Sequence, residues 1–390
     1  MKDQNKLSKK FKFPLNRVDW TNTLFLLGTL IVSLTIVPFY IWQHGADWSK
    51  VDILFHSILF FFYYCFTGMS ITLGYHRLFS HISFKAKWPV KLFTLVFGAA
   101  AFENSALDWS ADHRRHHKHV DTDLDPYNIN EGLFYAHIGW LLFKLRPIPP
   151  LNNVKDLLND KWVVWQHNWW KPVAFFTSFV VPFALGFSYG GYEHAWAALL
   201  ISGFLRIVAV QHSTFFINSF CHWIGNRPYS SHCTARDSWI MALVTFGEGY
   251  HNYHHEFQHD YRNGVKPWQF DPTKWTIWFM SLFGLTYNLR RVADANILRR
   301  EFIETELKVK RQLEILSEVE ISSIPQEYIL NSIEYLKSSA EVIKKVTDEL
   351  QAMANKKIDL SKSKFIQMRR EMDVILGHIQ IISQAKLKMA

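Results

Sequence analysis

The stretch ILFHSILFFFYYCFTGMSITLGYHRLFSH, residues 53–81, decides the fold class. Its first part, residues 53–73, is apolar and has roughly the 20 residues that a helix needs to cross a bilayer. Its end carries His76 and His81, whose imidazole rings are common metal ligands. The sequence therefore joins a predicted membrane helix to a candidate metal site.

Other apolar stretches have the length of a membrane span. They cover residues 20–41, 171–188 and 192–217, and Gly190 and Gly191 supply a tight turn between the last two. We predict an all-α integral membrane protein with a cytosolic helical cap that carries the histidines. Its four transmembrane helices are expected at about 20–41, 53–73, 171–188 and 192–217.

Basic residues flank the predicted spans on one side of the membrane. They occur in residues 1–19 and in residues 77–118, between the second and third spans. The positive-inside rule places both segments in the cytoplasm, so a multi-pass chain with four spans has both termini and the active site on that face. The net charge of +9 is not gathered in one stripe. This distribution favours the lipid bilayer, and no nucleic acid, as a partner.

The composition changes near residue 301 to Lys, Glu, Ile, Leu and Ser. Apolar residues recur with heptad spacing in residues 329–350 and 365–382, which indicates paired helices. We predict a basic cytosolic N-terminus at 1–19 and a membrane domain at 20–300. A helical hairpin or coiled-coil-like extension is expected at 301–390, serving packing or oligomerisation without chemistry.

Histidines gather in three clusters outside the predicted spans. HRLFSH contains a pair, and HRRHH and HNYHH repeat the pattern H-x-x-H-H, whose members share one face of a helix. The clusters comprise His76, His81, His113, His116, His117, His251, His254 and His255. A hydrogen-bonded role would explain any one of them, but three clusters beside membrane spans indicate metal ligation.

The number and type of these ligands constrain the metal. Eight imidazoles exceed the four ligands of a tetrahedral zinc site, so two metals are expected. Imidazole suits iron, zinc and copper. Iron is preferred for chemistry with O₂, because zinc has no redox chemistry.

Four longer segments carry a family resemblance. HRLFSH (76–81), DHRRHHKHVDTDLDPYN (112–128), INSFCHWIGNRPY (217–229) and GEGYHNYHHEF (247–257) strongly resemble the membrane-bound stearoyl-type (Δ9) acyl-CoA desaturases. The resemblance covers about residues 53–260 and implies an O₂-dependent oxidoreductase that introduces a cis double bond into a long-chain fatty acyl-CoA. It implies two iron ions (Fe²⁺/Fe³⁺) and two electrons from a separate donor: cytochrome b5, ferredoxin or a reductase. No haem-binding HPGG sequence is present, which favours a separate donor.

The same resemblance extends the ligand set. In the family, nine histidines and a water held by an asparagine surround the two irons. Matching residue by residue, His222 is implied as the ninth histidine and Asn218 as the asparagine. His119 has no counterpart among these ligands and is expected to serve outside the metal shell.

The resemblance also implies positions for the substrate. Trp109 and Thr214 match residues that flank the bend of the acyl chain, and Tyr64 matches the closed end of the tunnel. Gly68 lies one helical turn from Tyr64 on the same face, where we expect unused space.

Asn104 and Asp112 match positions near the acyl-CoA head group. The chain departs from the animal enzymes nearby, because Ala111 replaces an arginine and Glu103 replaces a glutamine. Acyl-CoA is the favoured carrier, while acyl-lipid and acyl carrier protein stay open.

Two rival functions remain. A membrane di-iron hydroxylase would begin from the same oxidant, and its product would be a hydroxy-acyl chain without an alkene. A metal transporter or sensor would place ionisable residues within the spans, facing a pathway. Most of the clustered histidines lie outside the predicted spans, which favours an enzyme.

Overall fold

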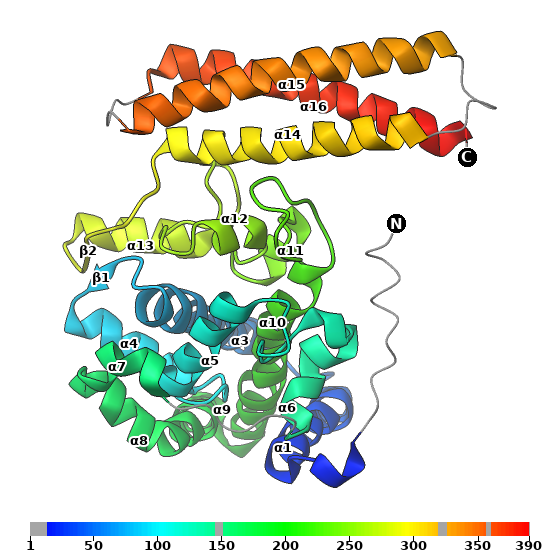
Figure 1. Ribbon diagram of the computed structural model, residues 1–390. Coiled ribbons are helices and arrows are strands. Elements are labelled where there is room, and N and C mark those ends of the chain that lie inside the picture. Colours follow the sequence, from blue (N-terminus) through cyan, green and yellow to red (C-terminus); the bar gives the residue numbers. More distant parts are fainter. Residues whose placement is uncertain (1–13, 145–150, 319–325, 356–359, 390) are drawn as a thin grey trace. The chain divides into compact units, whose positions relative to one another are not determined.

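The computed structural model describes residues 14–144, 151–318, 326–355 and 360–389 (Figure 1). Most of the predicted basic N-terminus lies outside this part of the chain. The described residues are mainly helical, and strands β1 (Lys85–Ala86) and β2 (Thr286–Tyr287) form a short antiparallel pair. The chain divides into one compact unit of residues 1–226 and 233–291 and a second of residues 227–232 and 292–390.

The first unit opens with two long apolar helical segments. Trp20–His44 contains α1 (Trp20–Ile31), the π-helical turn η3 (Val32–Ile36) and α2 (Val37–His44). Lys50–Ser80 contains α3 (Lys50–Met69) and the π-helix η4 (Ser70–Ser80). Asp19 caps α1, and Ser49 with Asp52 forms a capping box before α3, which fixes where the helices begin.

A third apolar segment runs from Lys161 to His222. It contains α8 (Lys161–Phe175), η8 (Phe176–Val180), α9 (Val181–Ala198), η9 (Leu199–Leu205), α10 (Arg206–Asn218) and η10 (Phe220–His222). The backbone leaves helical geometry at Gly190 and at Gly191, where φ is +75°. The rings of Phe179 and Phe204 then lie 4.9 Å apart. The turn predicted at the two glycines therefore reverses the chain.

These segments have the length and composition of membrane helices. Their apolar side chains are widely exposed, as at Leu24, Leu34 and Trp42, whereas a water-soluble protein would bury such a set. The structure therefore contains three helical segments able to cross a membrane, and it supports the prediction of an integral membrane protein.

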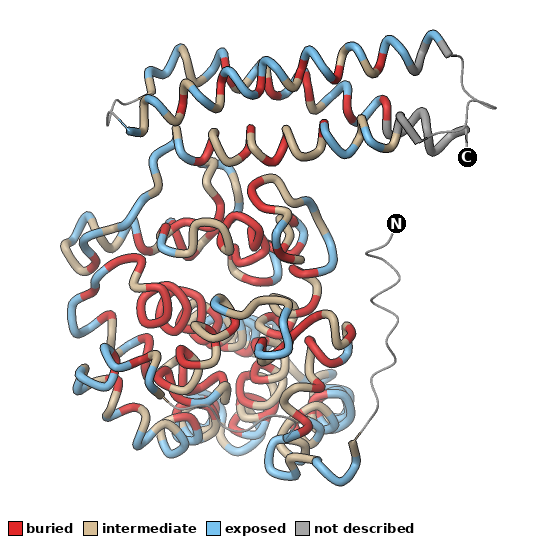
Figure 2. Tube along the Cα trace, viewed as in Figure 1, coloured by how far each residue is buried: buried red, intermediate tan, exposed pale blue. Residues whose placement is uncertain are grey.

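Shorter helices connect the apolar segments and carry polar residues. They are α4 (Trp88–Ala99), α5 (Ala106–His119), η5 (Ile129–Glu131), η6 (Tyr135–Gly139), α6 (Trp140–Leu142), η7 (Leu151–Val154), α7 (Lys155–Leu158), α11 (Trp239–Val244), α12 (His251–Glu256) and α13 (Pro272–Leu282). One apolar core, which includes Tyr75, Leu95 and Leu107, joins η4, α4 and α5. Buried residues are concentrated around these elements (Figure 2).

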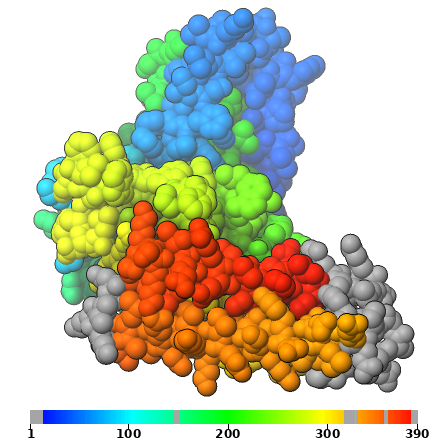
Figure 3. Space-filling view, turned by 90° about the horizontal axis from the view of Figure 1, so that it is seen from above, coloured from blue at the N-terminus to red at the C-terminus, as the bar shows by residue number. Residues whose placement is uncertain are grey.

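The second unit contains the helices α14 (Asp294–Glu318), α15 (Gln326–Asn355) and α16 (Lys362–Met389). Predicted heptad residues such as Leu336, Ile343 and Met372 form its buried core, together with Phe302 of α14. Helices α15 and α16, orange and red in Figure 3, lie side by side. The predicted hairpin is therefore incomplete, because α14 supplies a third helix and begins before residue 301.

Candidate metal centre

Four elements hold the nine histidines, and two of them, α5 and α12, carry the H-x-x-H-H pattern. His113, His116 and His117 lie on α5, and His251 and His255 lie on α12 with His254 between them. On these α-helices the H-x-x-H-H pattern brings the rings to one face, as predicted. His222 lies on η10, directly after α10.

His76 and His81 are brought together by a different local structure. They are five residues apart, a spacing that separates side chains on an α-helix. The segment is instead the π-helix η4, and the backbone N–H of His81 donates to the carbonyl of His76 at 3.1 Å. A π-helix has this i to i+5 repeat and occurs often at functional sites.

The nine histidines form two groups of side chains. Within each group, the potential ligand nitrogens lie within 4.8 Å of one another. The first group is His76, His81, His113, His117 and His254; the second is His116, His222, His251 and His255. His119 belongs to neither group. The structure thus brings together the nine histidines expected at the centre and separates them into two sets.

The distances between ring nitrogens fit metal ligation. Nε2 of His254 lies 3.0 Å from Nε2 of His76 and 2.9 Å from Nε2 of His117. Nε2 of His251 likewise lies 3.1 Å from Nε2 of both His222 and His255. Two nitrogens that bind one metal at about 2.1 Å in neighbouring positions are about 3 Å apart. Two neutral ring nitrogens this close can share only one hydrogen bond. A cation at the centre of each group would instead accept the lone pairs of several nitrogens at once.

The opposite ring nitrogens contact oxygen atoms that fix the ring orientation. Nδ1 of His76 lies 2.9 Å from the carboxylate of Glu248, and Nδ1 of His116 lies 2.8 Å from Asp125. Nδ1 of His222 lies 2.8 Å from the Thr234 hydroxyl. Such contacts leave Nε2 free to bind a metal. These contacts of the histidine rings with oxygen atoms were not predicted from the sequence. Glu248 and Asp125 nevertheless lie within the segments that carry the resemblance.

The carboxylates are themselves held in place by a buried network. Arg77 donates to Glu248 at 2.8 and 3.1 Å and to Asp271 at 3.0 and 3.1 Å. The Thr234 hydroxyl donates to Asp121 at 2.6 Å. The Arg77 guanidinium and the His76 ring hold the pKa of Glu248 below its usual range despite burial. Glu248 therefore stays ionised and favours a proton on the Nδ1 atom of His76 beside it.

Burial also controls the charge of the histidines. Loss of hydration and the neighbouring rings lower the pKa values of His81, His113 and His117, and those of His251, His254 and His255. Each ring is thus neutral near pH 7 and offers a lone pair. Neutral imidazole is the form that binds metals.

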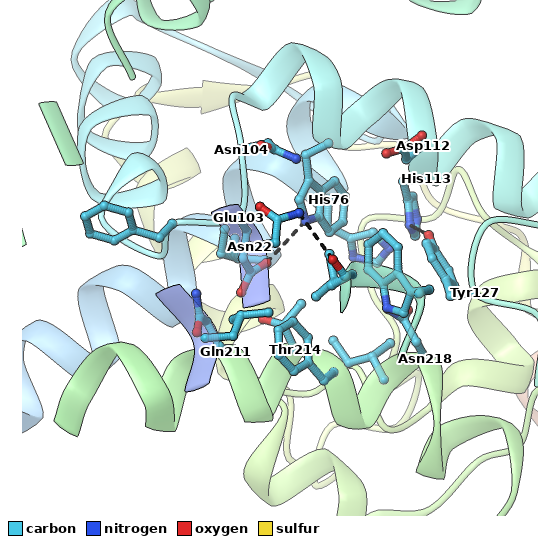
Figure 4. Close-up of a pocket in the computed structure, with 18 of the residues that line it drawn as sticks. Asn22, His76, Glu103, Asn104, Asp112, His113, Tyr127, Gln211, Thr214 and Asn218 are labelled. Carbon is cyan, nitrogen blue, oxygen red and sulfur yellow. Dashed lines mark hydrogen bonds between the residues drawn. The ribbon is translucent and has the colours of Figure 1, made fainter. Parts of the chain in front are cut away.

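A cavity leads to the first group of histidines (Figure 4). His76 and His113 line it, as do four of the residues expected at the substrate: Asn104, Trp109, Asp112 and Thr214. Asn218, expected to hold a water, also lines it. The Trp109 ring stacks on His113 with the ring centres 4.8 Å apart. The cavity wall therefore reaches the imidazole ligands directly.

Tyr64 and Gly68, expected at the end of the tunnel, are not among the residues that line this cavity. The Tyr64 hydroxyl lies 2.9 Å from the Ser213 hydroxyl, and its ring lies 5.1 Å from that of Phe246. A Cβ atom on Gly68 would lie 2.2 Å from Cε2 of Phe246. The expectation of unused space beside Gly68 is therefore wrong, because the Phe246 ring fills it.

Comparisons with known proteins agree with the site. The fatty acid desaturase family matches residues 53–291. The chain is 39% identical over 314 residues to acyl-CoA desaturase 1 of Saccharomyces cerevisiae, which covers 78% of this chain and 60% of that protein. It is 44% identical over 249 residues to a probable acyl-CoA desaturase of Schizosaccharomyces pombe, and the alignment covers 63% of this chain and 51% of that protein. It is 34% identical over 292 residues to human stearoyl-CoA desaturase, and the alignment covers 72% of this chain and 77% of that protein. The aligned part thus spans half to three fifths of the two yeast proteins.

Proposed function

The chain belongs to the fatty acid desaturase family, and on this premise we propose that it introduces a cis double bond, at Δ9, into a long-chain fatty acyl-CoA. The observation that carries the proposal is the pair of histidine groups, the first of which lines a cavity together with Trp109 and Thr214. The yeast and human relatives are acyl-CoA or stearoyl-CoA desaturases by name.

The donor set fits two iron ions, one in each histidine group. Asn218 would contribute to the second group through a water. When bound, the irons supply the redox chemistry by which O₂ removes two hydrogens from adjacent methylenes, with two electrons from a separate donor. Imidazole is a suitable ligand for iron, and carboxylates in contact with the opposite ring nitrogens keep the imidazoles in the required orientation.

The residues of this chain position the substrate. An acyl chain has no polar group at the reacting carbons, so the protein selects a bond by holding the chain in one place. Trp109 stacks on His113 and also lines the cavity. An acyl chain in contact with this ring lies close to the first histidine group and excludes water from it.

The proposal includes four membrane spans with both termini and the site in the cytoplasm. A straight helix of the length of Lys161–His222 would extend about 90 Å, three times the thickness of the hydrocarbon core. Reversal at Gly190 and Gly191 supports two crossings by this segment. The helices after Val292 form the extension and have no proposed chemistry.

Expression in a host that lacks its own desaturase tests the function. The wild-type chain should restore growth without added unsaturated fatty acid, and the double bonds in the host lipids should map to Δ9. The His116→Ala variant is the matched control and should restore nothing. A hydroxy-acyl product without an alkene would instead identify a hydroxylase. Assays of membranes with acyl-CoA or acyl-lipid then identify the carrier.

A further inference from the structure

The turn that follows α4 places one carboxyl group in the wall of the cavity. Its residues Phe102 and Asn104 have φ values of +56° and +69°, a left-handed conformation that side chains disfavour. Glu103 lies between them and lines the cavity. Strained residues persist only where their surroundings hold them, and they occur often at functional sites.

Three buried side chains hold this turn. Arg206 donates to the carbonyl of Ala100 at 2.6 Å, and Ser178 donates to the same carbonyl at 3.2 Å. Gln211 donates to the carbonyl of Ala101 at 3.1 Å. The residues that position Glu103 are therefore fixed by hydrogen bonds from η8 and α10.

The Glu103 carboxyl has few partners. Its Oε2 atom accepts from the indole N–H of Trp109 at 3.3 Å (Figure 4). Its Oε1 atom is buried and makes no hydrogen bond to the described residues. No Lys or Arg in the described part of the chain forms an ion pair with it. An ionised carboxylate in such surroundings is costly, whereas a neutral carboxylic acid is tolerated.

Thr214 is available as an acceptor for a proton on this carboxyl. The Thr214 hydroxyl donates its own proton to the carbonyl of Val210 at 3.3 Å, so its lone pairs can accept. With a proton on Glu103, the four residues can form one chain of hydrogen bonds. In it Trp109 donates to Glu103, Glu103 donates to Thr214, and Thr214 donates to the carbonyl of Val210. An ionised Glu103 would compete with Val210 for the Thr214 proton.

Other ionisable groups around the cavity do not neutralise Glu103. The hydroxyl of Tyr75 accepts from Gln166 at 2.6 Å and carries no charge near pH 7, so it cannot neutralise Glu103. The other ionisable residues that line the cavity are His76, Asp112, His113, Tyr127 and Glu248. Burial raises the pKa of Glu103 to about 8, although the Thr214 hydroxyl and the Trp109 indole act in the opposite direction.

We propose that Glu103 is a neutral carboxylic acid that donates its proton to Thr214 and thereby links α5 to α10 across the wall of the acyl-chain cavity. The inference rests on the proposed desaturase function. Loss of the proton breaks the link and puts a charge beside the apolar chain. Glu103 is thus a positioning residue, and acyl-chain binding weakens as the pH rises through its titration.

The pH dependence of KM tests the proposal in the full-length, iron-loaded enzyme with stearoyl-CoA. If only the protonated enzyme binds, KM at pH 9 is about tenfold higher than at pH 7. Glu103→Gln keeps one donor and one acceptor without a titrating proton, so it should retain activity and remove this rise. Glu103→Leu keeps neither and should raise KM at both pH values. Glu131→Gln, a substitution outside the cavity, should keep the wild-type rise.

Infrared spectroscopy detects the proton without turnover. The wild-type spectrum should contain a carbonyl band of a protonated carboxylic acid that is absent in Glu103→Gln and disappears between pH 7 and 9. A wild-type KM that stays constant over this range, an equal rise in Glu103→Gln, or the absence of the band at pH 7 would overturn the proposal. If the wild-type enzyme forms no alkene, the proposed function fails, and the infrared band still decides whether Glu103 holds a proton.

Discussion

At the scale of single residues, the metal centre depends on which ring nitrogen of each histidine carries the proton. Asp125 accepts from Nδ1 of His116, and the Glu248 carboxylate lies 2.9 Å from Nδ1 of His76. The proton then stays on Nδ1, and Nε2 faces the other ligands of its group. Arg77 keeps Glu248 ionised, so the orientation of one ligand depends on a cation that is not itself a ligand.

Glu248→Gln should lower iron affinity, because an amide accepts more weakly and can present its N–H₂ group to His76. Loss of such a partner typically costs about 10- to 100-fold in metal affinity. Iron content after equilibration with a competing chelator measures the effect. Asp123→Asn, an exposed change two residues before Asp125 in the sequence, is the control. Equal iron retention by Glu248→Gln and wild type would show that Glu248 does not orient His76.

A second prediction concerns the contact between Gly68 and Phe246. Gly68→Leu should destabilise the protein by about 1–3 kcal/mol, because the new side chain meets the Phe246 ring. Phe246→Ala provides space, so the double variant should be more stable than the sum of the single changes predicts. Thermal unfolding of iron-loaded protein in detergent measures the coupling. Additive losses would show that the two positions do not compete for the same space.

At the scale of elements, η4 lets a membrane helix become a ligand-bearing helix without interruption. Its π-helical repeat places His76 and His81 in one group. Gly74 lies in the same element, and a Cβ there would lie 2.5 Å from Cβ of Thr94. The close contact with α4 thus depends on a residue without a side chain, and it fixes the rotation of η4 toward the site.

Insertion of one alanine after Leu78 should remove iron from the first histidine group. The insertion changes the spacing of His76 and His81, so the two rings no longer face one point. Total iron should fall by about half or more, because two of the five ligands in this group are displaced. Iron analysis measures the loss, and an alanine inserted after Ala46, between α2 and α3, is the control. Full iron content after insertion at Leu78 would refute the role of the π-helix.

At the scale of the whole molecule, the ligands come from segments far apart in the sequence within the first unit. The second unit has its own apolar core, built from α14, α15 and α16. The short segment of residues 227–232 groups with these helices. No histidine of either metal-binding group lies in the second unit.

Removal of all residues after Arg291 should leave a folded membrane domain with full iron content. The cut precedes α14 and preserves both histidine groups. A modest loss of stability is expected, since residues 227–232 lose the unit with which they group. Iron analysis and size-exclusion chromatography in detergent provide the measurement. Failure of the truncated protein to bind iron would show that the extension is part of the core.

Local sequence patterns were enough to predict the membrane class and eight clustered histidines, and the family resemblance added His222. Apolar length and side-chain periodicity are local properties, and the histidine segments are specific enough to identify a family. Only the tertiary structure decided how the histidines divide into two groups and which oxygens face their other nitrogens. It also placed the Phe246 ring against Gly68 and Glu103 beside Thr214. These contacts join residues that are distant in the chain, and their geometry depends on helix rotation and packing, which local sequence patterns do not encode.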